Sequence, residues 1–346
     1  MVFSPEGWGL AAEALWRKAA WQGRPLPPGR ARLSLAGGEG GLRLVAAGML
    51  GEGRFEADLR RAEGDWRGEA RLEEVALAPL ASFLPPSFED LRGQATAVVG
   101  WRRHAGEDEA LFTGTVSDIV LAGRRFDELR VNLTCHGTEV VVETGQIRAG
   151  SGSASFHGRF DRRSRKTRLH LLAHRLPLDL LETGAGGWIE GRLEVDGTWP
   201  AGIEGTGWFR LGDLAWQGIP LGTAQAELSL AEGRLTLRHG CLETADGEMD
   251  WGGTIALAGR KELDLEGRFD LEARPWSRLL PGAAALHGRM AGEVHLSGTL
   301  DDPKVRAELE AGAGAVYGVA WDSAEAELQW QGNRLFIERG VVRALG

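Results

Sequence analysis

The 346-residue chain has little of what several common architectures require. Its two cysteines, Cys135 and Cys241, could pair or stay as small buried thiols, but they do not make a disulfide framework. No apolar run approaches the roughly 18 residues of a spanning helix, and no signal-peptide pattern opens the chain. A net charge of −9 argues against nucleic-acid binding, which usually needs a basic face.

Catalytic motifs are also missing from the sequence. It contains no Gly-x-Ser-x-Gly elbow, no phosphate-binding Gly-x4-Gly-Lys-Ser/Thr loop and no His-Glu-x-x-His pair. His170 and His174 would lie ~13 Å apart along a strand, too far to share a metal ion. The basic segment Arg162–Lys166 is interpreted as a solvated hairpin tip, with contact to anionic lipid headgroups as the alternative. We therefore expect a protein that is not an enzyme and holds no cofactor or metal.

What is present is a strict alternation of polar and apolar residues. Between Glu262 and Arg274, every even position is charged and every odd position is apolar or glycine. Successive side chains of a strand point to opposite faces, so this pattern predicts a strand with one wet and one dry face. The same pattern recurs along most of the chain, between short turn sequences rich in Gly, Asp and Asn. Short strands of this kind predict an all-β, antiparallel fold.

Helical signals are few. Three short segments that begin at a proline could form helices, namely Pro79–Leu84, Pro177–Leu181 and Pro275–Leu280. The segment Ala11–Ala20 has helix-forming composition, but it also fits a strand, and both possibilities stay open at this stage.

The sequence also repeats itself with a period of about 98 residues. Three sets of residues recur at spacings of 95 to 100: Gly23, Gly123, Gly218 and Gly318; Gly145, Gly240 and Gly340; Pro79, Pro177 and Pro275. Internal repeats of this length indicate one continuous array. We expect residues 1–346 to form that array, with a partial first repeat at 1–78, repeats at 79–176 and 177–274, and a partial last repeat at 275–346. This frame suggests a slice of a longer protein.

Each predicted strand has a dry face that something must cover. Two sheets could cover one another, one sheet could close on itself, or one elongated, curled sheet could stay open and form an apolar groove for a ligand. The continuous repeats favour the open groove. By parity, the residues that would line it include Leu193, Val195, Leu228, Leu230, Leu263, Leu265, Phe269, Leu271, Val294, Leu296, Leu309 and Leu328.

The region from Gly292 to Arg343 resembles the repeat unit of the AsmA-like and TamB-like proteins of diderm bacteria. The step Gly298-Thr-Leu-x-x-Pro303 between two alternating segments is the most specific part of the resemblance, and a degenerate copy lies at Gly197–Pro200. The resemblance implies a repeating β-groove that carries phospholipids between the inner and outer membranes. It also implies a periplasmic location and, in the full-length parent, an inner-membrane anchor that this chain lacks.

The partners that follow are phospholipid acyl chains, the flanking regions of a longer parent and, by the resemblance, an outer-membrane assembly partner; no nucleic acid is expected. Two other functions stay open. One is a structural or outer-membrane assembly array without bound lipid. The other is a carbohydrate enzyme, which the 13 tryptophans allow, although no paired carboxylates stand out.

Overall fold

The computed structural model describes residues 2–4, 7–17, 19–21, 24–38, 41–78, 90–104, 107–181, 185–199, 202–216, 219–257, 261–276, 287–299, 301–316, 319–332 and 334–344. The predicted fold class is confirmed: the chain is all-β, and its long strands form open antiparallel sheet. The residues divide into two compact units, Met1–Leu171 and Leu172–Gly346, and each unit is described here by itself.

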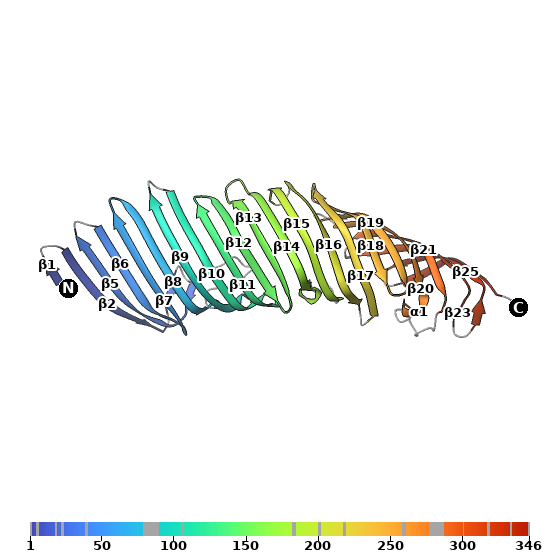
Figure 1. Cartoon of the computed structure of the whole chain (residues 1–346), viewed down its shortest axis with the longest axis horizontal. Coiled ribbons are helices and arrows are strands. Elements are labelled where there is room, and N and C mark those ends of the chain that lie inside the picture. The colour runs from blue at the N-terminus through green and yellow to red at the C-terminus, as the bar shows by residue number, and fades with distance from the viewer. Residues whose placement is uncertain are drawn as a thin grey trace. The chain divides into compact units, whose positions relative to one another are not determined.

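In the first unit, each strand of the main sheet up to β13 (Gly152–Asp161) pairs with the next strand of that sheet along the chain (Figure 1). A separate two-stranded ladder, β3 (Ala19–Trp21) with β4 (Arg24–Leu26), interrupts the path between β2 and β5. The strands of the main sheet here are β1 (Val2–Ser4), β2 (Gly7–Trp16), β5 (Gly29–Gly38), β6 (Gly41–Leu50), β7 (Gly53–Ala62), β8 (Asp65–Ala76), β9 (Arg92–His104), β10 (Glu107–Leu121), β11 (Arg124–His136), β12 (Glu139–Ala149), β13 (Gly152–Asp161) and β14 (Lys166–Pro177), which contains the division between the units.

The second unit follows the same plan. A small ladder again forms here, from β23 (Gly314–Val316) and β24 (Val319–Trp321). The other strands are β15 (Ala185–Thr198), β16 (Gly202–Trp216), β17 (Ile219–Ala231), β18 (Arg234–Thr244), β19 (Gly247–Ala256), β20 (Glu262–Glu272), β21 (Arg289–Thr299), β22 (Pro303–Ala311), β25 (Ser323–Gln331) and β26 (Arg334–Arg343).

Longer connections follow β8, β14 and β20, so six strands lie between one such connection and the next. The expected helix at Pro177–Leu181 is present as a single turn, η3 (Leu178–Leu181). The turn α1 (Ala273–Trp276) overlaps the expected helix Pro275–Leu280 only at its first two residues, and the rest of that segment lies outside the described residues. The third, at Pro79–Leu84, lies outside the described residues. The ambiguous segment Ala11–Ala20 is strand where it is described: residues 11–16 belong to β2 and pair one by one with β5, and residues 19–20 belong to β3.

One of the recurring glycines, Gly123, lies at a hairpin turn. Gly123 has φ +73° and follows Ala122 at φ +50°, between β10 and β11. Positive φ at both central residues is the geometry of a two-residue type I′ turn, which glycine adopts at low cost. The equivalent residues Gly23, Gly218 and Gly318 lie outside the described residues.

The sheet buries little. The chain exposes 22,428 Å², whereas a compact monomer of 37.3 kDa would expose roughly 14,000 Å². About half of the buried apolar residues among those described are alanines, and Val75 is the one large side chain with less than 2% of its surface exposed. Packing in each unit therefore comes mainly from neighbours within the sheet.

Glycines recur directly opposite aromatic side chains on neighbouring strands. A Cβ atom added to Gly240 would lie 2.5 Å from the ring of Trp251, its partner on β19. Gly29 faces Trp16 and Gly37 faces Trp8 in the same way. Further such pairs are Gly145 with Phe156, Gly212 with Trp188 and Gly314 with Trp321. Each glycine leaves a flat surface on which the ring packs, which relates the abundance of glycine to that of tryptophan.

This packing predicts a specific cost for filling one of these surfaces. Gly240→Val would push the Trp251 ring off β18, and we expect a loss of about 1–3 kcal/mol in the free energy of unfolding, as for other overpacked sites. Denaturant unfolding followed by tryptophan fluorescence measures this loss. Gly312→Val is the matched control, because a Cβ there meets nothing within 4 Å. Equal stability of the two variants would contradict the role of Gly240.

Candidate functional site

The register joins apolar residues into rows that cross the strands. Directly opposite residues of an antiparallel pair share a face. One row crosses the second unit from β15 to β26: Leu193, Gly207, Leu228, Leu237, Gly253, Leu265, Leu296, Val305, Trp330 and Leu335. None of these ten residues carries an ionisable group.

A second row runs on the same face. It consists of Ile189, Leu211, Ala224, Leu242, Met249, Phe269, Gly292, Leu309, Ala326 and Gly340. It is also free of ionisable side chains. We call this side of β15–β22, β25 and β26 the apolar face of the second unit.

All twelve residues predicted to line a groove lie on this apolar face. Leu193, Leu228, Leu265 and Leu296 belong to the first row, and Phe269 and Leu309 belong to the second. Val195, Leu230 and Leu263 lie in a parallel row, Val294 and Leu328 in another, and Leu271 in a third. Leu263 and Leu271 are each 7% exposed, and the other ten are half-buried by their neighbours in the sheet. Their contact with lipid stays a prediction.

The first unit has an equivalent apolar face that the predicted set omits. One of its rows contains Leu10, Leu35, Leu44, Leu59, Gly68, Trp101, Ala110, Cys135, Val140 and Phe160. The neighbouring row contains Ala12, Leu33, Ala46, Ala57, Ala70, Val99, Phe112, Leu133, Val142 and Gly158. Apolar and polar residues alternate along these strands too, so the same sequence pattern could have identified this face.

The opposite face of each sheet carries the charges. In the second unit, Arg268 pairs with Glu293 at 2.9 Å and Arg289 pairs with Asp270 at 2.6 Å. In the first unit, the hydrogen bonds from Arg43 and Arg60 hold the pKa of Asp58 well below its usual range. Exposed ion pairs add little stability, so this polar face mainly keeps one side of the sheet in water.

The two cysteines lie on different kinds of surface. Cys135 belongs to the apolar face of the first unit, whereas Cys241 lies between Gln225 and Asp250 on the polar face of the second. Both are free thiols. Burial, together with the nearby carboxylates of Glu243 and Asp250, raises the pKa of the Cys241 thiol and so favours its protonated form.

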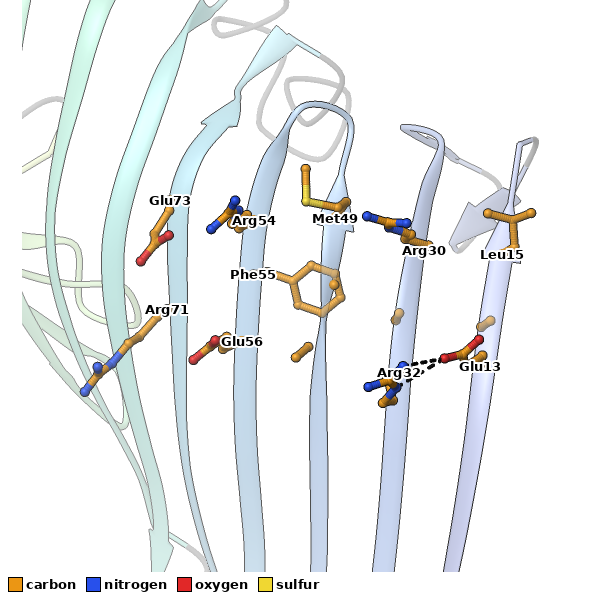
Figure 2. Close-up of a pocket in the computed structure, with 14 residues that line it drawn as sticks. Glu13, Leu15, Arg30, Arg32, Met49, Arg54, Phe55, Glu56, Arg71 and Glu73 are labelled. Carbon is orange, nitrogen blue, oxygen red and sulfur yellow. Dashed lines mark hydrogen bonds and ion pairs between the residues drawn. The ribbon is translucent and has the colours of Figure 1, made fainter.

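Shallow depressions border the polar face. The one in Figure 2 encloses about 800 Å³, and its labelled side chains come from neighbouring strands of the first unit. Arg30, Met49 and Arg54 are consecutive cross-strand partners there, and Arg32 pairs with Glu13 at 2.8 Å. In the second unit, Phe269, Val294 and Leu309 of the predicted lining set also border such depressions, whose remaining residues come mostly from the polar face.

The basic hairpin tip is built around an acid. The carboxylate of Asp161 accepts hydrogen bonds from the backbone N–H groups of Arg163 and Ser164 at 2.9 and 2.6 Å, and from the hydroxyl of Thr138 at 2.9 Å. The Arg162 guanidinium donates to the carbonyl of Gly137. These bonds account for the tip as a folded turn without an added ligand.

The histidines of β14 do not form a shared site. His170 stacks on His157 with ring centroids 4.7 Å apart, while His174 lies 3.5 Å from Glu190, so the two predicted histidines have different neighbours. No group of three or more His, Cys, Asp or Glu side chains in the described part of the chain could hold a metal ion. In that same part, no helix has the length and hydropathy to cross a membrane.

Comparison with known proteins gives no identification. No family model, curated protein or solved structure matches this chain.

The hairpin tip predicts a pH dependence. Hydrogen bonds from Ser164 and Thr138 lower the pKa of Asp161 from 3.8 to about 2. The folded chain therefore favours the ionised carboxylate of Asp161. The stability that this carboxylate contributes is fully present above pH 3.8 and is lost as the pH falls through about 2. Carboxyl NMR of Asp161 should show this low midpoint, and Thr138→Val should raise it. A midpoint near 3.8 in the folded chain would contradict the bonded turn.

Proposed function

We propose that this chain is a segment of an envelope-spanning lipid-transfer bridge of the AsmA-like and TamB-like kind, and that phospholipids move along its apolar face. One observation carries the proposal: rows of apolar residues cross ten strands of the second unit without an ionisable side chain. The resemblance of residues 292–343 to the repeat of those proteins agrees with it.

The physical argument concerns what the apolar face contacts. Extended contact of apolar side chains with water is unfavourable, so large apolar patches usually mark a binding surface. Acyl chains would cover this face, and transfer of each CH2 group from water contributes about 0.8 kcal/mol. Lipid headgroups would remain in water at the margins of the sheet. Each row presents similar apolar side chains on successive strands. A lipid that moves along the rows therefore passes from one strand to the next without crossing a charged barrier.

In this mechanism no side chain performs chemistry. Leucine, valine and alanine make the surface apolar along its whole length. Glycines, which have no side chain, leave shallow recesses in it. The charged residues of the polar face keep the other side of the sheet in contact with water. The direction of transport would come from the lipid gradient or from partners, with the sheet as a passive track.

The first test is the lipid content of the purified chain. We expect organic extraction and mass spectrometry to find phospholipid at a fixed ratio per chain, above that of a cytosolic all-β control protein. A clean extract from a folded, monodisperse chain would refute the lipid track and favour an array whose apolar faces cover one another.

Substitutions on one strand locate the lipid. Leu265→Arg combined with Leu271→Arg places two charges on the apolar face of β20. We expect lipid occupancy to fall about tenfold, which corresponds to about 1.4 kcal/mol, because charged groups are costly to place against acyl chains. Circular dichroism should show that the β content is retained.

The matched control uses the other face of the same strand. Glu262→Arg combined with Glu266→Arg puts two arginines on the polar face of β20, where we expect unchanged occupancy. If both double variants lose lipid equally, or if neither does, the apolar face is not the lipid-binding surface.

A further inference from the structure

The apolar face of the first unit is charged along one margin. Arg61 on β7 and Arg103 on β9 are both direct partners of Trp66 on β8, the strand between them (Figure 1). The pairing is regular from these residues to Leu59 and Trp101, so all of them point to the side of the sheet that carries the apolar rows. Three adjacent strands therefore present arginine, tryptophan and arginine next to each other, and we call these three residues the Arg–Trp–Arg row.

The two arginines of this row are only weakly compensated. Arg61 forms no ion pair with the described residues, and its guanidinium group lies over the ring of Trp66, 5.5 Å from the ring centroid. Arg103 lies 3.6 Å from its direct partner Asp108, in a pair whose side chains are each 52% exposed. Exposed ion pairs of this kind are weak, so both guanidinium groups have N–H donors to offer to an anion.

An apolar surface begins directly beside the row. The residues that follow Arg103 on the same side of β9 are Trp101, Val99 and Ala97, and their cross-strand partners on β8 and β10 carry no charge. Ala97 lies about 20 Å from Arg103 along the strand, at about 3.4 Å per residue. The acyl chains of one bilayer leaflet fill about 15 Å, half of the hydrocarbon thickness. The apolar surface beside the arginines is therefore long enough for an acyl chain.

The charged margin is a local feature rather than a consequence of the repeating fold. In the second unit, the hairpins β15–β16, β17–β18 and β19–β20 turn at the equivalent margin. The row of the apolar face nearest to those turns is uncharged and includes Val195, Gly205, Leu230, Leu235, Ile255 and Leu263. The sheet therefore does not need arginines at this place in order to fold.

The combination of charge and apolar length favours one class of ligand. An acidic peptide would match the arginines but would leave the neighbouring apolar rows in water. A phospholipid matches both, because its phosphate group is anionic and its acyl chains are apolar. Trp66 has an indole ring, a group that is enriched at the level between headgroups and acyl chains in membranes.

We propose that the Arg–Trp–Arg row binds the phosphate group of phospholipids whose acyl chains lie on the apolar face of the first unit. This inference rests on the proposed function and adds a headgroup site to it. Arg61 and Arg103 lie on strands about 10 Å apart, so their long side chains converge on one phosphate group above Trp66. Arginine suits this role because its planar guanidinium group donates two N–H bonds to phosphate oxygens.

The first experiment measures the binding of a single short-chain phospholipid. The probe is dihexanoyl phosphatidylglycerol, kept below the concentration at which it forms micelles, and its binding to the full chain is followed by phosphorus NMR. We expect saturable binding. Arg61→Gln combined with Arg103→Gln should weaken it about tenfold, because charge-assisted hydrogen bonds to the phosphate group are lost. Circular dichroism should show unchanged β content.

The matched control uses the other face of the same two strands. Arg60→Gln combined with Arg102→Gln removes the same charge from β7 and β9. These arginines lie on the polar face, where they pair with Asp58 and Glu109. We expect this double variant to bind the phospholipid as the unaltered chain does.

Two further probes separate the phosphate group from the chains. Inorganic phosphate has the charge without the chains, and we expect it to bind at least about tenfold more weakly than the phospholipid. Octyl glucoside has a chain without a phosphate group, so the substitution of Arg61 and Arg103 should leave its binding unchanged.

The outcomes distinguish the headgroup site from the proposed function. If the unaltered chain binds no phospholipid, both are refuted. If it binds the phospholipid and the two double variants bind it equally well, or lose it equally, the headgroup site is refuted while the apolar face still binds lipid. Inorganic phosphate that binds as tightly as the phospholipid would show a site for a free ion and would also refute the headgroup site.

Discussion

The structure depends on one constraint: a sheet of a single layer has to find its stability within its own plane. In a two-layer domain, apolar side chains are buried by the opposite layer. Here about half of the described buried apolar residues are alanines, and many of the large apolar side chains, such as Leu265, Phe269 and Leu296, stay half-buried. Cross-strand hydrogen bonds and lateral contacts between neighbouring side chains have to provide what a core otherwise provides. The strict alternation follows, because a charge on the apolar face would interrupt those lateral contacts.

Pairs of glycine and aromatic residues are the clearest adaptation to this constraint. A ring that stands upright on a single layer exposes most of its surface, whereas a ring that lies across a glycine covers the backbone and gains contact. Trp251 on Gly240 and Trp16 on Gly29 show this arrangement in the two units. Glycine is usually unfavourable inside a strand, so the contact with the ring offsets a local cost.

The sequence predicts the fold class and the faces well wherever a strand is regular. Leu263, Leu265 and Leu271 share a face because β20 pairs without a register shift on either side. Parity fails across a bulge. Leu235 and Leu242 are seven positions apart and should point to opposite sides, yet both lie on the apolar face, because His239, at φ +49°, adds one residue to β18. The sequence also does not predict that Gly240 pairs with Trp251, because this pairing depends on the length of a hairpin and on the position of that bulge. Spacing revealed that Gly240 recurs, but only the register explains why.

A sheet held together by neighbours has properties that a globular core lacks. Each strand is stabilised chiefly by the strands on either side of it, as in other repeat proteins, so the free energy is distributed along the array rather than concentrated at one place. β26 is the last described strand of the second unit. Many edge strands are protected by prolines or inward-pointing charges. β26 has no proline, and the side chains that it directs to the apolar face are uncharged. The chemistry of the apolar face therefore continues without a break through the last described strand.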